Sequence, residues 1–157
     1  MERLYLLYSR NIYRRARELL GDGDAARDAT QEVFVRIIDS GGKVPSDPTP
    51  TAWLHRVTTN LCLNRLRDRN RRREILSLEY RPQTTAAAVT EPRAMVLDIL
   101  DRIPEDLQEV AIYFFVDEMT YVEIAEALGV SKRTVSNRLA AFRELVERLF
   151  PDRRLAS

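Results

Sequence analysis

Residues 120–145, TYVEIAEALGVSKRTVSNRLAAFREL, contain a short apolar segment, a glycine and a longer polar segment. Thr120 and Glu123 have the T-x-x-E spacing of a capping box, in which each side chain bonds the backbone at a helix start. Gly129 follows the first segment, where a helix commonly ends on a residue with a positive φ angle. Ser131 then has the residue type and position of an N-cap. The stretch therefore predicts a helix-turn-helix.

The second helix of this pair is expected to have one buried face and one cationic face. Its apolar positions recur at steps of three and four residues: Val135, Leu139, Phe142 and Val146. The polar positions are Lys132, Arg133, Ser136, Asn137 and Arg138, with Arg143 one to two turns further along. Such side chains supply donors and acceptors for base edges and phosphates, so the pattern favours a DNA recognition helix. A surface helical hairpin with a solvated basic face is the alternative.

Helical periodicity continues on the N-terminal side of this motif. Met95 to Leu100 reads as a short helix, and Pro104 opens another with acidic residues in its first turn. The expected buried face of that second helix is formed by Leu107, Val110, Ala111 and Phe114.

The first half of the chain predicts three further helices and no strand. They cover about residues 4–19, 25–39 and 50–69, with Gly21 and Gly23 stopping the first. In the third, the expected inward residues are Trp53, Leu54, Val57 and Leu61. The sequence thus predicts an all-α fold of two small helical domains joined by a flexible linker. The expected bounds are 1–73, a linker at 74–93, and a helix-turn-helix domain at 94–157.

The third predicted helix carries a polar stripe and ends in a cluster of arginines. Arg56, Asn60, Asn64 and Arg67 are spaced so that they share one helical face. The cluster, LNRLRDRNRRR at 63–73, holds six arginines and one aspartate. Amides beside guanidinium groups suit exposed bases and their phosphates. A solvated helix end explains the same residues equally well.

The second predicted helix differs because its exposed positions include Asp28, Gln31 and Glu32. An acidic face is a poor surface for DNA and a plausible one for docking a protein. Taken alone, the segment is also compatible with an ordinary solvated face.

Charge is sorted along the chain although the formal net charge is only +1. Residues 55–73 carry a net +6, residues 91–130 a net −8 and residues 131–154 a net +4. Two separate basic segments predict two contacts with a polyanion. One histidine, one cysteine and no phosphate-cradling glycine loop disfavour an enzyme, a metal site or a bound cofactor. The lone cysteine and the lack of a long apolar run predict a cytoplasmic protein without membrane insertion.

Considered together, these motifs resemble those of the extracytoplasmic-function sigma factors, the small sigma subunits of bacterial RNA polymerase. DATQEVFVR at 28–36 is similar to the family's D-x-x-Q-E-x-F signature. WLHRVTTNLCLNRLR at 53–67 is similar to its W-L-x-R-[IV]-x-x-N-x-x-x-[ND]-x-x-R segment. The segment at 103–139 is similar to the domain that reads the minus-thirty-five element. Four motifs in the family's order, counting the first helix, are more specific than any one of them.

The resemblance implies partners and roles for individual residues. It implies that Asp28, Gln31 and Glu32 dock on the polymerase clamp helices, with a second contact between the C-terminal domain and the flap. It implies that Arg36 and Asn60 meet the melted minus-ten element, together with the stripe residues Arg56, Asn64 and Arg67. It also implies that the recognition helix reads the minus-thirty-five duplex through Lys132, Arg133, Ser136, Asn137, Arg138 and Arg143. An anti-sigma factor is a further partner that the family suggests.

The loop before the third helix departs from the family pattern. In relatives it often carries an aromatic residue that helps to form the pocket for a captured base, whereas here it reads GGKVPSDPTPTA. No pocket residue is therefore assigned within 41–51. A stand-alone helix-turn-helix regulator with a sensing or dimerising first half explains the C-terminal domain equally well, but it leaves DATQEVF unexplained. A helical adaptor that binds only protein is a third alternative.

Overall fold

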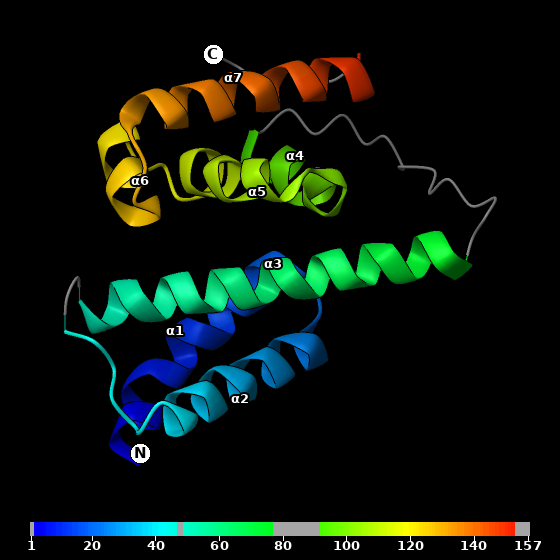
Figure 1. Cartoon of the computed structure of the whole chain (residues 1–157). Coiled ribbons are helices and arrows are strands. Elements are labelled where there is room, and N and C mark those ends of the chain that lie inside the picture. The colour runs from blue at the N-terminus through cyan, green and yellow to red at the C-terminus, as the bar shows by residue number, and fades with distance from the viewer. Residues whose placement is uncertain (1, 47–48, 77–91, 153–157) are drawn as a thin grey trace. The chain divides into compact units, whose positions relative to one another are not determined.

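The computed structural model describes residues 2–46, 49–76 and 92–152, and each element in these ranges is a helix (Figure 1). The chain divides into two compact units, Met1–Arg73 and Glu74–Ser157. The expected all-α fold of two helical domains is confirmed. Most of the expected linker, residues 77–91, lies outside the described residues.

The first unit consists of three helices, α1 (Glu2–Leu20), α2 (Gly23–Asp39) and α3 (Pro50–Leu76). α1 and α2 form a hairpin, and α3 crosses both of them (Figure 1). The turn of the hairpin depends on Gly21, whose φ of +73° suits a residue without a side chain. The N-cap Asp22 then accepts a 2.8 Å hydrogen bond from the amide of Ala25. Gly23 was expected to help end α1, but it is the first residue of α2, because Asp22 provides the cap one position earlier.

The core of the first unit combines large and small apolar side chains with one buried arginine. Ala16, Ala29 and Val33 are fully buried and allow α1 and α2 to approach closely. Arg15 of α1 is only 6% exposed, and its Nε donates a 3.1 Å hydrogen bond to Oγ1 of Thr59 on α3. A second bond, also 3.1 Å, joins Arg15 to Glu18. A buried guanidinium needs such partners, so this arginine fixes where α3 crosses α1.

The third helix differs from its prediction in length and in part of its buried face. It runs to Leu76 rather than to about Arg69, because no glycine or proline interrupts the arginine-rich segment. Trp53 and Val57 are only partly buried, whereas Thr58 and Thr59 are buried. Both threonine hydroxyls donate to backbone carbonyls one turn back, at 2.7 and 2.8 Å. Intrahelical bonds of this kind allow polar residues to occupy core positions.

The second unit contains α4 (Pro92–Ile99), η1 (Leu100–Arg102), α5 (Glu105–Ala111), η2 (Ile112–Val116), α6 (Tyr121–Leu128) and α7 (Lys132–Leu149). α7 packs on α5 and α6 (Figure 1). The expected helix at 95–100 begins three residues earlier and ends as a 3₁₀ turn. Gln108 is fully buried, and its Nε2 donates a 2.9 Å bond to the carbonyl of Leu100, which closes this turn.

The end of α5 explains an error in the predicted core. Leu107, Val110 and Ala111 are buried as expected, but Phe114 is only partly buried. After Ala111 the backbone widens into the π-helical turn η2, which shifts the face that later residues present. Tyr113 is buried in place of Phe114.

The helix-turn-helix prediction is confirmed in its caps and in its buried stripe. The Thr120 amide donates to Oε2 of Glu123 at 2.7 Å, and the Glu123 amide donates to Oγ1 of Thr120 at 3.3 Å. These bonds from Thr120 lower the pKa of Glu123 below its usual value. Gly129 has a φ of +66°, and Ser131 accepts a bond from the amide of Thr134 at 3.1 Å. The apolar stripe of α7 is almost completely inaccessible to solvent: Val135, Leu139, Phe142 and Val146.

The turn at Gly129 predicts a stability change that comes from backbone conformation alone. A Cβ atom at this position would meet no atom within 4 Å, so Gly129→Ala creates no clash. The left-handed conformation should nevertheless cost about 1–2 kcal/mol of stability. Thermal unfolding measures the change. Gly129→Asn should cost less, because asparagine tolerates this region. Equal stability of Gly129→Ala and wild type would contradict the account.

Candidate nucleic-acid and protein interfaces

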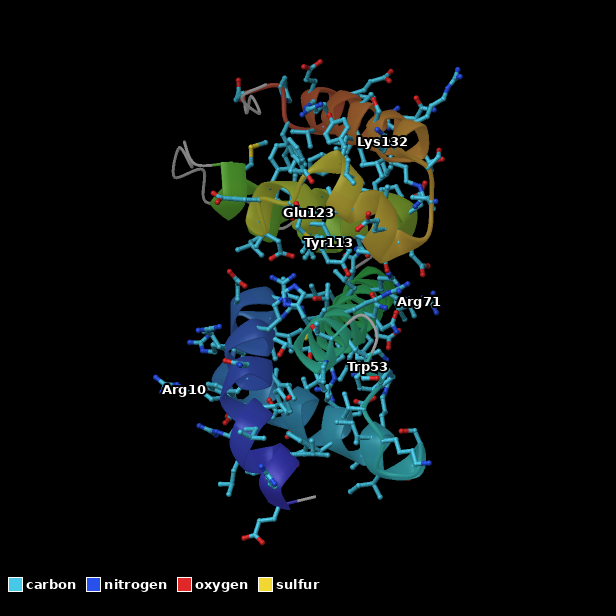
Figure 2. All side chains as sticks on the ribbon, turned by 90° about the vertical axis from the view of Figure 1, so that its left-hand side faces the viewer. Arg10, Trp53, Arg71, Tyr113, Glu123 and Lys132 are labelled. Carbon is cyan, nitrogen blue, oxygen red and sulfur yellow. The ribbon has the colours of Figure 1, made fainter. Side chains whose placement is uncertain are left out.

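The start of α7 presents a polar surface that the core of the second unit does not use. Lys132, Arg133, Ser136 and Asn137 are exposed and Arg138 is partly exposed. Figure 2 shows Lys132 at the beginning of the helix. Two adjacent cations at the positive end of a helix dipole favour an anionic ligand. Four of the predicted recognition residues therefore share one accessible surface at the helix start, and Arg138 lies to the side of it.

Arg143 lies apart from this group, against aromatic side chains. Its guanidinium carbon is 5.6 Å from the ring centroid of Phe114 and 5.8 Å from that of Phe115. The two rings are 4.9 Å apart in an edge-on arrangement, and Tyr121 and Phe142 extend the cluster. Nε of Arg143 is buried and has no hydrogen-bond acceptor among the described residues. The structure thus places Arg143 in a cation–π contact, which the sequence pattern did not indicate.

The polar stripe on α3 is formed as the spacing predicted. Arg56 and Asn64 are exposed, while Asn60 and Arg67 are partly buried. Nη1 of Arg67 donates a 2.6 Å bond to Oδ1 of Asn64, which shows that these two side chains lie on the same face. Oδ1 of Asn60 is buried and accepts no hydrogen bond from the described residues.

The arginine cluster that ends α3 is divided by the fold. Arg69, Arg71 and Arg72 are exposed, and Figure 2 shows Arg71 on the outside of the helix. Arg65 turns toward α2, where Nη1 is 3.4 Å from the carbonyl oxygen of Ala25. Because Arg65 is engaged within the unit, the cluster presents fewer cations to a ligand than its composition suggests.

The predicted docking face of α2 contains two exposed residues and one engaged residue. Asp28 and Gln31 are exposed on successive turns. The same face continues into Val35 and Ile38, whose relative exposures are 51% and 54%. Exposed apolar residues that follow an acidic and an amide side chain are compatible with a protein-binding surface.

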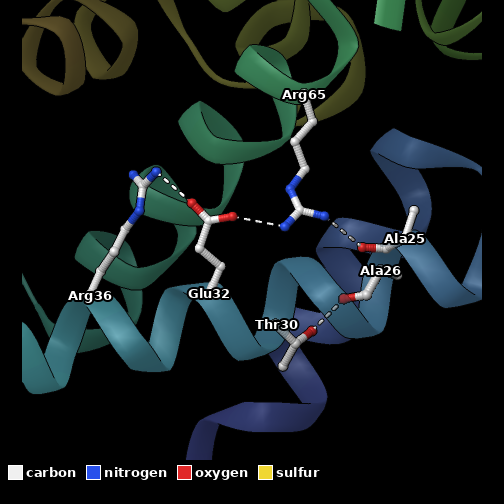
Figure 3. A network of polar contacts seen from close by, with 6 residues as sticks. All are labelled: Ala25, Ala26, Thr30, Glu32, Arg36 and Arg65. Carbon is white, nitrogen blue, oxygen red and sulfur yellow. Dashed lines mark hydrogen bonds and ion pairs between the residues drawn. The ribbon is translucent and has the colours of Figure 1, made fainter. Parts of the chain in front are cut away.

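Both carboxylate oxygens of Glu32 on α2 are engaged, one by Arg65 of α3 and the other by Arg36 of α2 itself (Figure 3). Oε2 accepts a 2.8 Å bond from Nη2 of Arg65, and Oε1 accepts a 2.8 Å bond from Nη2 of Arg36. The hydrogen bond from Arg65 lowers the pKa of Glu32 below its usual value, and the bond and charge of Arg36 act in the same direction. The sequence alone does not reveal this pairing, because Arg65 lies 33 residues away.

A further cationic surface on α1 was not identified from the sequence. Arg3, Arg10, Arg14 and Arg17 are all exposed, and Figure 2 shows Arg10 projecting outward. Their spacing of seven, four and three residues places them on one face, so helical periodicity could have indicated this stripe. Arg17 donates to the carbonyl of Gly21.

Cys62 is a buried core residue, and burial raises its pKa to about 12. Such a thiol is an unreactive packing residue. Within the described ranges, no three His, Cys, Asp or Glu side chains are placed to hold a metal ion. No helix in those ranges is long and apolar enough to cross a bilayer.

Comparison with family models gives two matches that coincide with the two units. Residues 4–72 match Sigma-70 region 2, and residues 93–146 match Sigma-70 region 4. The chain belongs to the sigma-70 family of RNA polymerase sigma factors, and within it to the extracytoplasmic-function type.

Several curated relatives are sigma factors of this type. The chain is 33% identical to the ECF RNA polymerase sigma factor SigE of Mycolicibacterium smegmatis over 82% of its own length and 52% of that protein. It therefore spans about half the length of this relative. It is 26% identical to SigM of Mycobacterium tuberculosis, with 94% of this chain and 76% of that protein covered.

A solved structure shows the same fold. It is the sigma factor RpoE from Bartonella quintana, in complex with the anti-sigma factor NepR. The TM-score is 0.54 at 19% identity, and the match covers 98% of each chain.

The aromatic contact of Arg143 predicts a structural role that can be measured without DNA. Arg143→Ala should destabilise the second unit by about 1 kcal/mol, because it removes a partly buried cation–π contact and the packing of the aliphatic stem. Thermal unfolding provides the measurement. Arg148→Ala, at an exposed position of the same helix, is the control and should shift the midpoint little. An unchanged midpoint combined with weaker DNA binding would instead make Arg143 a phosphate contact.

Proposed function

We propose that this protein binds core RNA polymerase and directs promoter recognition, DNA melting and the initiation of transcription. The observation that supports this most directly is the combination of a capped helix-turn-helix having exposed cations with a separate unit that has an acidic face and a cationic helix. Membership in the sigma-70 family supports the same function, because the two units match two regions of sigma factors. The proposed site of action is the cytoplasm, where the polymerase works.

In this proposal α2 provides the docking surface for the polymerase. Asp28 and Gln31 contact the clamp helices directly, because both are exposed and the Asp28 carboxylate forms no ion pair with another described residue. Glu32 belongs to the same surface, although its oxygens are already engaged by Arg36 and Arg65. The second unit would make the additional contact, with the flap.

The two cationic helices are proposed to meet promoter DNA at different places. The stripe on α3 and Arg36 contact the melted minus-ten strand: Arg36, Arg56, Asn60, Asn64 and Arg67. The start of α7 contacts the minus-thirty-five duplex: Lys132, Arg133, Ser136, Asn137 and Arg138. For Arg143 the aromatic contact supports a positioning role beside this surface. An anti-sigma factor is proposed as a regulatory partner, since the solved structure with the same fold is such a complex.

The direct test is transcription in vitro with core polymerase and a library of genomic fragments. Added protein should produce discrete transcripts that core polymerase alone does not produce. Sequence-specific DNA binding without polymerase, and no new transcripts with it, would favour a stand-alone helix-turn-helix regulator.

The docking surface predicts a loss of polymerase affinity when its charge is reversed. Asp28→Lys should weaken assembly with core polymerase by at least tenfold, because an interfacial charge contact of this kind contributes a few kcal/mol. Titration of labelled core polymerase measures the affinity. Asp24→Lys makes the same charge change on the same helix, where the carboxylate pairs only locally with Arg27 at 2.6 Å, and it should have little effect. Equal losses would remove α2 from the interface.

The two cationic surfaces predict different responses to arginine removal. Arg133→Ala should weaken promoter binding and relax the preference at one upstream base position by about 1–3 kcal/mol, if its guanidinium reads a base edge. Arg71→Ala with Arg72→Ala should lower affinity without changing base preference, because phosphate contacts carry no sequence information. It should also reduce the salt slope by about 0.7 for each single-strand phosphate that the variant no longer neutralises. Holoenzyme binding to promoter variants across a salt series provides the measurement. If the arginine pair changes base preference and Arg133 does not, the two roles are reversed.

A further inference from the structure

The carboxylate of Glu32 holds two arginines that differ in accessibility and in origin. Arg36 lies one turn away on α2, and its side chain is 48% exposed. Arg65 comes from α3, and its side chain is 31% exposed. Glu32 itself is 38% exposed, so solvent or a ligand can reach the group from one side. Both ion pairs have the same length, 2.8 Å.

The two ion pairs of Glu32 differ in how easily a competing anion can break them. Arg65 also approaches the carbonyl of Ala25, so its guanidinium is held at two points between the helices (Figure 3). Arg36 has only Glu32 as a partner among the described residues, in an exposed contact between neighbouring turns. Exposed pairs of this type contribute little, whereas fixed and partly buried pairs resist exchange. Arg36 is therefore the partner that a competing anion can take.

We propose that Glu32 is a positioning residue that holds Arg36 in the free protein and releases it to a phosphate of the melted promoter strand. This inference rests on the proposed function, which places Arg36 at the minus-ten element. Arg65 is essential to the exchange, because it keeps the carboxylate paired after Arg36 has left. Glu32 thus sets how strongly DNA must compete for Arg36, and it acts on DNA binding through that arginine.

If the charge of Glu32 is removed, DNA no longer has to compete with it for Arg36, and DNA binding should become tighter. A structural defect would instead weaken DNA binding. In Glu32→Gln the side chain keeps its size and can still accept a hydrogen bond, but it no longer attracts Arg36 by charge. An exposed ion pair corresponds to roughly a two- to fivefold change in an equilibrium constant. We expect a gain of that size in affinity for single-stranded DNA.

The experiment uses the full-length chain and a fluorescein-labelled oligodeoxythymidine, with binding followed by anisotropy at low salt. Removing any carboxylate reduces repulsion of DNA, so Asp24→Asn is the matched control, since Asp24 also pairs with an arginine on α2. Glu32→Gln should bind about two- to fivefold more tightly than Asp24→Asn. In an Arg36→Gln background the advantage of Glu32→Gln over the control should disappear.

A second arm tests the role of Arg65. Arg65→Gln leaves Glu32 with Arg36 alone, so it should weaken binding more than Arg69→Gln, which removes an exposed arginine from the same helix. Adding Glu32→Gln to Arg65→Gln should restore affinity. The proposal is overturned if Glu32→Gln matches Asp24→Asn, if it binds more weakly than wild type, if its gain survives without Arg36, or if the restoration fails. None of these measurements involves polymerase, so failure of the proposed function would appear separately in the transcription assay.

Discussion

The ion pair between Glu32 and Arg65 joins a helix suited to protein contacts with a helix suited to DNA contacts. At 2.8 Å it links α2 to α3, and the buried bond from Arg15 to Thr59 links α1 to the same helix. Apolar packing among the three described helices of the first unit is not directional, so polar contacts at the helix crossings specify how α3 lies. The acidic face of α2 and the polar stripe of α3 consequently keep a fixed relation within this unit.

In the second unit, an aromatic cluster helps to hold α7 in place. A helix that presents cations to DNA must still be attached firmly, because a loosely held recognition helix would lose entropy on binding. Four fully buried apolar residues attach α7, and Arg143 adds a contact with two phenylalanine rings. The π-helical turn places these rings beside α7 by shifting the register at the end of α5. In both units, therefore, some arginines stabilise the fold while others stay available.

Features determined by neighbouring residues could be predicted from the sequence, and features determined by distant ones could not. The capping box, the glycine turn and the buried stripe of α7 each depend on residues within one or two turns, and all three were predicted correctly. The exposure of Phe114 was not, because periodicity extrapolated through a π-helical turn gives the wrong face. The predicted end of α3 was too early. A dense run of arginines is typical of a solvated helix end, but arginine also favours helix, so the helix continues. The partners of Arg15, Glu32 and Arg143 follow from tertiary packing, which periodicity does not report.

The arginine cluster at the end of α3 shows why composition overstates the charge that a ligand meets. Among its described members, Arg65 neutralises Glu32, and Arg67 is bonded to Asn64. Arg69, Arg71 and Arg72 remain exposed without an ion pair to the described residues. Arg36 lies outside the cluster. Its only described side-chain partner is Glu32, and the carboxylate of Glu32 is also bonded to Arg65. The arginines that DNA can engage are thus determined by which carboxylates and carbonyls the fold has already assigned, and a count of basic residues cannot identify them.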